Sequence, residues 1–267
     1  MASILPSATR SDAPPGTISH RAVVIGSIVG ITLLAWAYLL YQAWAMDHMD
    51  TVAMAMPGIH TWGMWDLTLV FTMWAVMMVG MMVPSVSPVV LMFARIQQQR
   101  RAQGQAFIAN WLFLLGYLIV WIGFSLAATL VQWVLHAAML ISPLMVGTSP
   151  LLGGAVLIAA GIYQWTPAKH ACLTRCRSPL GFLLNDWRDG TWGALAMGAR
   201  HGLYCTGCCW LLMLVLFVVG VMNLLWIALL TVLVLLEKTM SRGLWINRVS
   251  GAALIAWGGW MGSAALV

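Results

Sequence analysis

Long apolar segments, most of them without a charged residue, recur along the whole chain of 267 residues. A helix that crosses the hydrocarbon core of a bilayer needs about 20 such residues. Only 7% of the residues are charged and 62% are hydrophobic, whereas soluble domains carry roughly 25% charged residues. We therefore expect a multi-pass membrane protein with the lipid bilayer as its surroundings. A soluble enzyme, a nucleic-acid-binding protein and a disordered chain are excluded.

The apolar runs are continuous and do not alternate, which favours an all-α transmembrane helix bundle over a β-barrel. Residues 1–21 are polar and contain several prolines, so we expect a disordered cytoplasmic tail before a single transmembrane domain at 22–267. The fourth and sixth predicted spans are short, and the fifth and sixth should form a tight helical hairpin. The sequence predicts about seven spans, at residues 22–41, 67–92, 107–135, 151–165, 201–219, 221–236 and 249–266.

The basic residues indicate how such a bundle would be oriented. If the seven spans alternate in direction, all 13 Lys and Arg residues fall on one side of the membrane. The other side carries Asp47, Asp50 and Asp66 and no basic residue. Because Lys and Arg accumulate in cytoplasmic loops, we expect a cytoplasmic N-terminus and location in the plasma membrane, which is the inner membrane in a bacterium.

Methionine and histidine are concentrated in the loop that follows the first span. Met46, His48 and Met49 are its first candidate ligands. Thioether and imidazole groups are soft to borderline ligands that suit copper. The alternative is an interfacial loop whose methionines dip into the surface of the bilayer.

A second methionine-rich run lies in the second predicted span. Met73, Met77 and Met81 share one helical stripe. Pro84 has no N–H to donate to the Gly80 carbonyl, so a kink is expected there. A kinked helix lined with thioethers would suit the passage of a soft cation. The alternative is packing, because methionine fills irregular gaps between helices.

The most specific cluster contains all five cysteines. His201, Cys205 and Cys208 have the i, i+4, i+7 spacing that places residues on one helix face. A helix N-terminus and nearby arginines would favour the thiolates that bind metal. An odd number of cysteines on the cytoplasmic side argues against a disulfide framework. The alternative is that they are small buried hydrophobic residues. The candidate ligands are His170, Cys172, Cys176, His201, Cys205, Cys208, Cys209 and Glu237.

Several of these segments resemble a known family. They are the run 73–85, the loop 170–180, the block 198–210 with 217–223 after it, and the pair 237–238. They resemble the domain of unknown function 2182 family, whose members are described as predicted metal-binding integral membrane proteins. The Cys-Thr-Gly-Cys-Cys-Trp block at 205–210 is its most specific element. The resemblance implies a helical membrane protein that binds a metal ion, but it does not include the loop that contains Met46.

The leading hypothesis is a membrane protein that binds a metal ion and transports or delivers it, and that is not an enzyme. Copper is favoured and zinc is the second candidate, with a metal chaperone or a membrane complex as protein partner. One alternative is a thiol–disulfide oxidoreductase that uses Cys205 and Cys208, whose C-x-x-C spacing is typical of redox pairs. Another is a structural subunit of a larger membrane complex.

Overall fold

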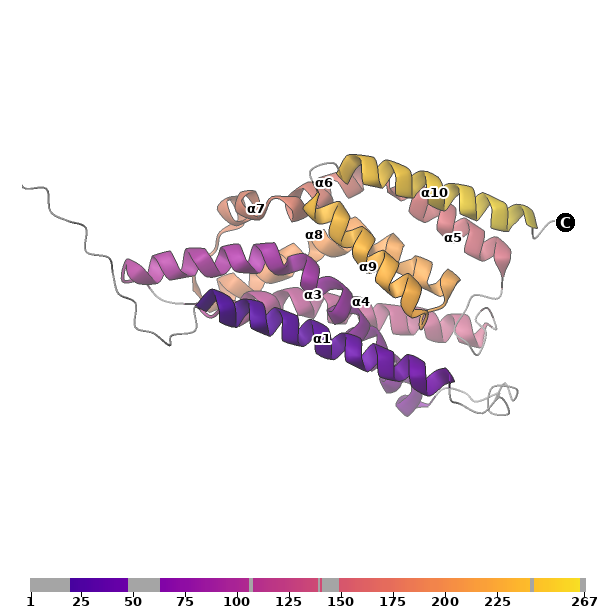
Figure 1. Ribbon diagram of the computed structural model, residues 1–267, viewed down its shortest axis with the longest axis horizontal. Coiled ribbons are helices and arrows are strands. Elements are labelled where there is room, and N and C mark those ends of the chain that lie inside the picture. The colour runs from indigo at the N-terminus through magenta and orange to yellow at the C-terminus, as the bar shows by residue number, and fades with distance from the viewer. Residues whose placement is uncertain are drawn as a thin grey trace, which may run out of the picture.

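The computed structural model describes residues 20–47, 63–105, 108–138, 140, 149–240 and 243–264. Within these ranges it has nine helices and no strand, so the all-α prediction is confirmed. Most of them run side by side along the long axis of the molecule (Figure 1). The helices are α1 (His20–Asp47), α3 (Met64–Ala102), α4 (Asn110–Ala137), α5 (Pro150–Tyr163), α6 (Pro167–Arg177), α7 (Pro179–Asp186), α8 (Gly190–Val219), α9 (Leu224–Thr239) and α10 (Gly243–Ala264).

The helices pack as a series of neighbours. α1 packs on α3, α3 on α4, and α4 on α8. α8 in turn contacts α5 and α6, and α5 pairs with α10 on the side of the molecule opposite α1 (Figure 1). α9 lies against α3, α6, α8 and α10. The segments that contain the cysteines, α6 and α8, are therefore near the middle of this series.

Glycines permit the closest helix crossings. A Cβ atom on Gly198 of α8 would overlap the carbonyl oxygen of Phe113 in α4, and one on Gly116 of α4 would overlap the backbone of α8. On the other side, a Cβ on Gly154 of α5 would lie 2.7 Å from the carbonyl oxygen of Gly258 in α10. Small residues that bring backbones together are typical of helix packing in membranes.

Four helices are long and apolar enough to cross a membrane: α1, α3, α4 and α8. The bent pair of α5 and α6, with 63° between its two helices, would make a fifth. α5 and α9 have only 14 and 16 residues, fewer than the roughly 20 that a perpendicular span needs. Helix length and apolar composition together thus support four or five spans. Both the seven-span count and the cytoplasmic N-terminus stay predictions.

α3 continues through two internal prolines, Pro84 and Pro88. Each proline leaves the carbonyl four residues earlier without its helical donor. The Trp36 indole of α1 donates to the carbonyl freed at Gly80, at 3.3 Å. The Ser87 hydroxyl donates to the carbonyl of Pro84, at 2.8 Å. Side chains thus replace both lost hydrogen bonds, and the helix stays continuous.

Candidate metal site

The three cysteines of α8 lie in the middle of that helix and not at its start. α8 begins at Gly190, eleven residues before the start predicted for the fifth span. Cys205, Cys208 and Cys209 are therefore far from the helix N-terminus, and the expectation that the N-terminus activates their thiols was wrong. All three are at most 1% exposed. Their sulfur atoms point into the bundle.

Cys205 is surrounded by hydrogen-bonding groups from three other helices. The Lys238 ammonium of α9 donates to the Cys205 sulfur at 2.8 Å and to the Ser85 hydroxyl of α3 at 2.9 Å. The Tyr117 hydroxyl of α4 is 3.1 Å from the same sulfur and donates to the Met82 carbonyl at 3.2 Å. Lys238 is 8% exposed and Tyr117 is fully buried. A positive charge thus lies beside the sulfur, shielded from water.

The neighbouring α6 adds two thiols to those of α8. The Cys176 thiol lies close enough to the Cys208 thiol for the two to interact electrostatically. Cys172, one turn earlier, packs on Gly207, where an added Cβ would lie 2.9 Å from its sulfur. The structure therefore brings together four buried thiols, those of Cys176, Cys205, Cys208 and Cys209, with the partly buried Cys172 beside them.

These groups interact with one another, but they do not form a site in which three or more ligands surround one ion. The sulfur atoms of Cys208 and Cys209 both donate to the Cys205 carbonyl, each at 3.0 Å. In the part of the chain that the structure describes, no three His, Cys, Asp or Glu side chains are arranged to hold an ion together. What the arrangement offers is pairs of adjacent thiols, one of them formed between helices by Cys176 and Cys208. Soft thiolate ligands select ions such as Cu(I).

His201 lies on the same face of α8, one turn before Cys205. It is 2% exposed and is surrounded by aromatic rings, with its ring centroid 4.9 Å from that of Phe182 and 6.1 Å from that of Tyr117. Its Nδ1 atom has no hydrogen-bond partner. A buried ring nitrogen without a partner is unusual, and it lies close to the cluster of thiols.

Glu237 is held by a different partner. Its carboxylate accepts from the Lys169 ammonium of α6 at 2.8 Å and from the Gln164 amide at 3.0 Å. Both charged side chains are 1% exposed. Arg177 also donates to the main-chain carbonyls of Glu237 and Met240, each at 2.6 Å, and so attaches α6 to the end of α9. In this structure the Glu237 carboxylate is part of an ion pair between helices, and its hydrogen bonds go to Lys169 and Gln164 and not to a thiol.

Comparison with known proteins adds an independent observation. The sequence model of the PpoB2 family, described as copper chaperones, matches residues 71–261. The chain belongs to this family. No curated protein and no solved structure matches it. The matched segment includes every cysteine, both histidines of the cluster and the buried lysines.

The other predicted ligands of this PpoB2 family member have different surroundings. His170 is partly buried in α6, and its imidazole is not among the groups that hydrogen-bond to the cysteine sulfur atoms in the described residues. Met73, Met77 and Met81 are at most 4% exposed and belong to the main hydrophobic core. The side chain of Met46 and the residues His48 and Met49 lie outside the described part of the chain.

Lys238, Tyr117 and Lys169 belong to this region but were not predicted to be part of it. One signal was available for the lysines, because an ionisable residue beside an apolar helix is expensive and marks a functional position by default. Lys238 lies at the end of the apolar run of α9, after Glu237. No comparable signal marks Tyr117, since tyrosine is common in membrane helices.

Proposed function

We propose that this protein binds copper as Cu(I) through the buried thiols of α6 and α8 and delivers it to another protein. The observation that supports this most directly is the grouping of four buried thiols from α6 and α8, those of Cys176, Cys205, Cys208 and Cys209, in a chain of the copper chaperone family. A pair of thiolates is enough for a linearly coordinated soft ion. Soft thiolate ligands favour Cu(I), whereas structural zinc takes four ligands.

The net charge of a copper-loaded site suggests a role for Lys238. A cuprous ion with two thiolates carries a net negative charge, which is expensive to bury without a partner. The Lys238 ammonium lies 2.8 Å from the Cys205 sulfur and has no carboxylate partner in the described residues. We propose that it neutralises the loaded site. Binding would release the thiol protons and free the Cys205 carbonyl from the sulfur atoms that donate to it in this structure.

The surroundings of the site suit a protein that holds its cargo in a membrane. The thiols lie in the interior of the bundle, where water and cellular thiols have little access. We propose a plasma-membrane location with seven spans, a cytoplasmic N-terminus and the thiols near the cytoplasmic side. A metal chaperone or a membrane complex would receive the copper. The resemblance to the domain of unknown function 2182 family supports the same proposal.

The direct test is metal content. The purified chain is loaded with Cu(I) and passed through a desalting column, and copper is measured per chain in the wild type, the Cys205→Ser/Cys208→Ser variant and the Thr206→Ala variant. Thr206 lies between the two cysteines on α8 and offers no thiol. We expect bound copper in the wild type and the control and its loss in the double variant. Equal copper content in all three, or retention of zinc alone, would overturn the proposal.

Thiol–disulfide exchange is the second candidate, and the spacing of Cys205 and Cys208 is what favours it. All five cysteines are free, but both members of this pair are at most 1% exposed, which hinders exchange with a protein partner. Alkylation separates the two candidates. Copper should protect the thiols from an alkylating reagent until a chelator removes it, whereas a redox pair would form a titratable disulfide in metal-free protein.

A further inference from the structure

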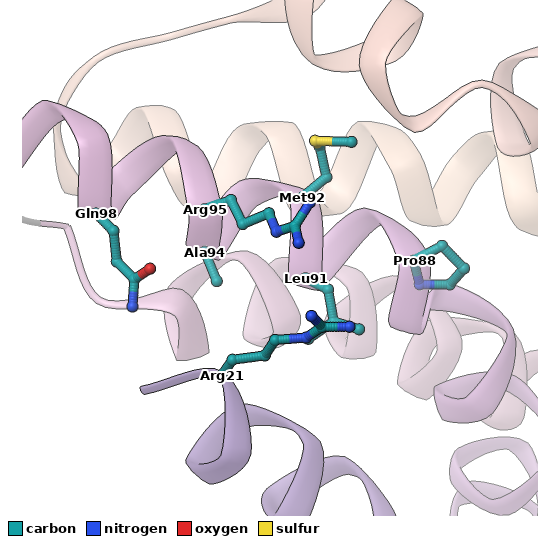
Figure 2. Close-up of a pocket in the computed structure, with 7 residues that line it drawn as sticks. All are labelled: Arg21, Pro88, Leu91, Met92, Ala94, Arg95 and Gln98. Atoms are coloured by element: carbon teal, nitrogen blue, oxygen red, sulfur yellow. The ribbon is translucent and has the colours of Figure 1, made fainter. Parts of the chain in front are cut away.

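A cavity of about 190 Å³ opens between the start of α1 and the C-terminal half of α3. Figure 2 shows Arg21 extending from α1 toward Leu91, and Arg95 extending along α3 beside Met92. One part of the lining is cationic or polar and the other is apolar. The polar part of the lining consists of Arg21, Arg95 and Gln98. The apolar part includes Pro88, Leu91 and Met92.

No acidic side chain in the described part of the chain neutralises either guanidinium of this cavity. Within the described ranges, Arg21 and Arg95 take part in no ion pair and no hydrogen bond. Two other arginines are paired with acidic side chains, and one of them is Arg200, which binds Asp186 at 2.8 Å. Arg100 binds Asp189 at 2.6 Å and lies 5.0 Å from the centroid of the Trp187 ring.

The acidic side chains that the structure describes are already used elsewhere. Asp186 and Asp189 pair with arginines, and Glu237 pairs with a lysine. Asp66 accepts from the Gly63 N–H at 2.9 Å, at the opposite end of α3. None of them remains for the two arginines of the cavity. An anion from outside the described chain is therefore the natural partner of this site.

The position of the cavity along α3 indicates where that anion would come from. α3 has 39 residues, so it is roughly 58 Å long at 1.5 Å per residue, well beyond a hydrocarbon core of about 30 Å. Its polar end, from Arg95 to Ala102, must extend past the core. α1 exposes apolar side chains such as Val29 and Leu33 along its length, as a lipid-facing helix does. The cavity thus lies where lipid headgroups meet acyl chains.

We propose that this cavity binds an anionic phospholipid, with the phosphate between Arg21 and Arg95 and the first part of an acyl chain against Pro88, Leu91 and Met92. Guanidinium groups bind phosphate oxygens through paired hydrogen bonds. A free phosphate would meet the same arginines but would gain nothing from the apolar wall. The lipid fastens the start of α1 to α3, and this role is independent of copper.

The test measures lipid binding to the full-length chain after detergent has removed its lipids. Phosphatidylglycerol is titrated into the wild type, Arg21→Gln/Arg95→Gln and Arg175→Gln/Arg248→Gln, and native mass spectrometry counts the bound lipids. The second variant removes the same charge from two exposed arginines outside the cavity. At about 1 kcal/mol for each basic residue near a lipid surface, we expect roughly a 30-fold weaker affinity in the first variant and wild-type affinity in the second.

Two further titrations distinguish the sources of the anion. Phosphatidylcholine should bind the wild type more weakly than phosphatidylglycerol, and inorganic phosphate should not displace bound phosphatidylglycerol. Equal weakening in both double variants would show that only the overall charge matters and would overturn the proposal. Displacement by inorganic phosphate, or equal affinity for the two lipids, would overturn it as well.

Discussion

The buried ion pair between Lys169 of α6 and Glu237 of α9 offers the sharpest test of the structure. Both side chains are 1% exposed and the atoms of the pair are 2.8 Å apart. Removing one partner leaves the other charge buried without compensation, which typically costs about 3–5 kcal/mol. Removing both partners leaves no uncompensated buried charge, although the attraction between the two charges is lost as well. We therefore expect Glu237→Gln and Lys169→Met to destabilise strongly, and the double variant to be more stable than either.

Thermal unfolding in detergent, followed by the fluorescence of the 16 tryptophans, measures these differences. Each single variant should unfold on the order of 10 °C below the wild type, given about 2–4 °C for each kcal/mol in a domain of this size. If the two effects were independent, the double variant would lose about 6–10 kcal/mol. An additive double variant would refute the claim that these side chains form a pair.

The same variants decide whether Glu237 is also a ligand. The sequence analysis counted Glu237 among the metal ligands, whereas the structure gives its carboxylate to Lys169 and Gln164. Copper bound per folded chain should then be the same in Glu237→Gln and Lys169→Met. A loss of copper confined to Glu237→Gln would show that the carboxylate leaves its ion pair to bind the ion.

Three further predictions follow from other contacts. Gly198→Ala should destabilise by about 1–3 kcal/mol, because its Cβ would overlap the α4 backbone; Gly123→Ala, with open space around it, should keep the wild-type melting temperature. Tyr117→Phe should lower stability by about 1 kcal/mol through a lost buried hydrogen bond, measurable in the same melts. Trp187 is the main cause that holds the pKa of Asp189 below its ordinary value. The stabilisation that Asp189 provides is therefore complete above about pH 4 and is lost as the pH falls through the lowered pKa, so the melting temperatures of wild type and Asp189→Asn should converge only in acid.

Composition was sufficient to predict the helical class, but it placed the start of α8 wrongly. The prediction began the fifth span at His201 because Arg200 interrupts the apolar run. In the structure α8 continues through Arg200, which pairs with Asp186 at 2.8 Å. A contact with a residue outside the helix compensates the charge, and hydropathy along the sequence does not register such a contact. The segment 167–186 was expected to be a loop, because α6 is rich in charged and polar residues and α7 has only eight residues.

In the candidate site, too, some residues could be predicted from the sequence and others could not. Helical spacing correctly placed His201, Cys205 and Cys208 on one buried face. It had no means of finding Tyr117, which reaches Cys205 from a helix 88 positions away in sequence. The spacing of cysteines on one helix is a local property, whereas the partner of each thiol depends on the crossing of α4 and α8, which the glycines Gly116 and Gly198 determine.

The two adjacent ionisable residues of α9 show what the sequence alone leaves open. Glu237 and Lys238 are neighbours in sequence, and nothing in the sequence distinguishes the partners of the two side chains. The structure separates their roles: Glu237 pairs with Lys169, while Lys238 donates to a cysteine sulfur and a serine hydroxyl. A buried ammonium without a carboxylate partner costs stability, unless the group beside it becomes negative. Copper-loaded thiolates would supply that negative charge, so the position of Lys238 makes most sense in the loaded protein.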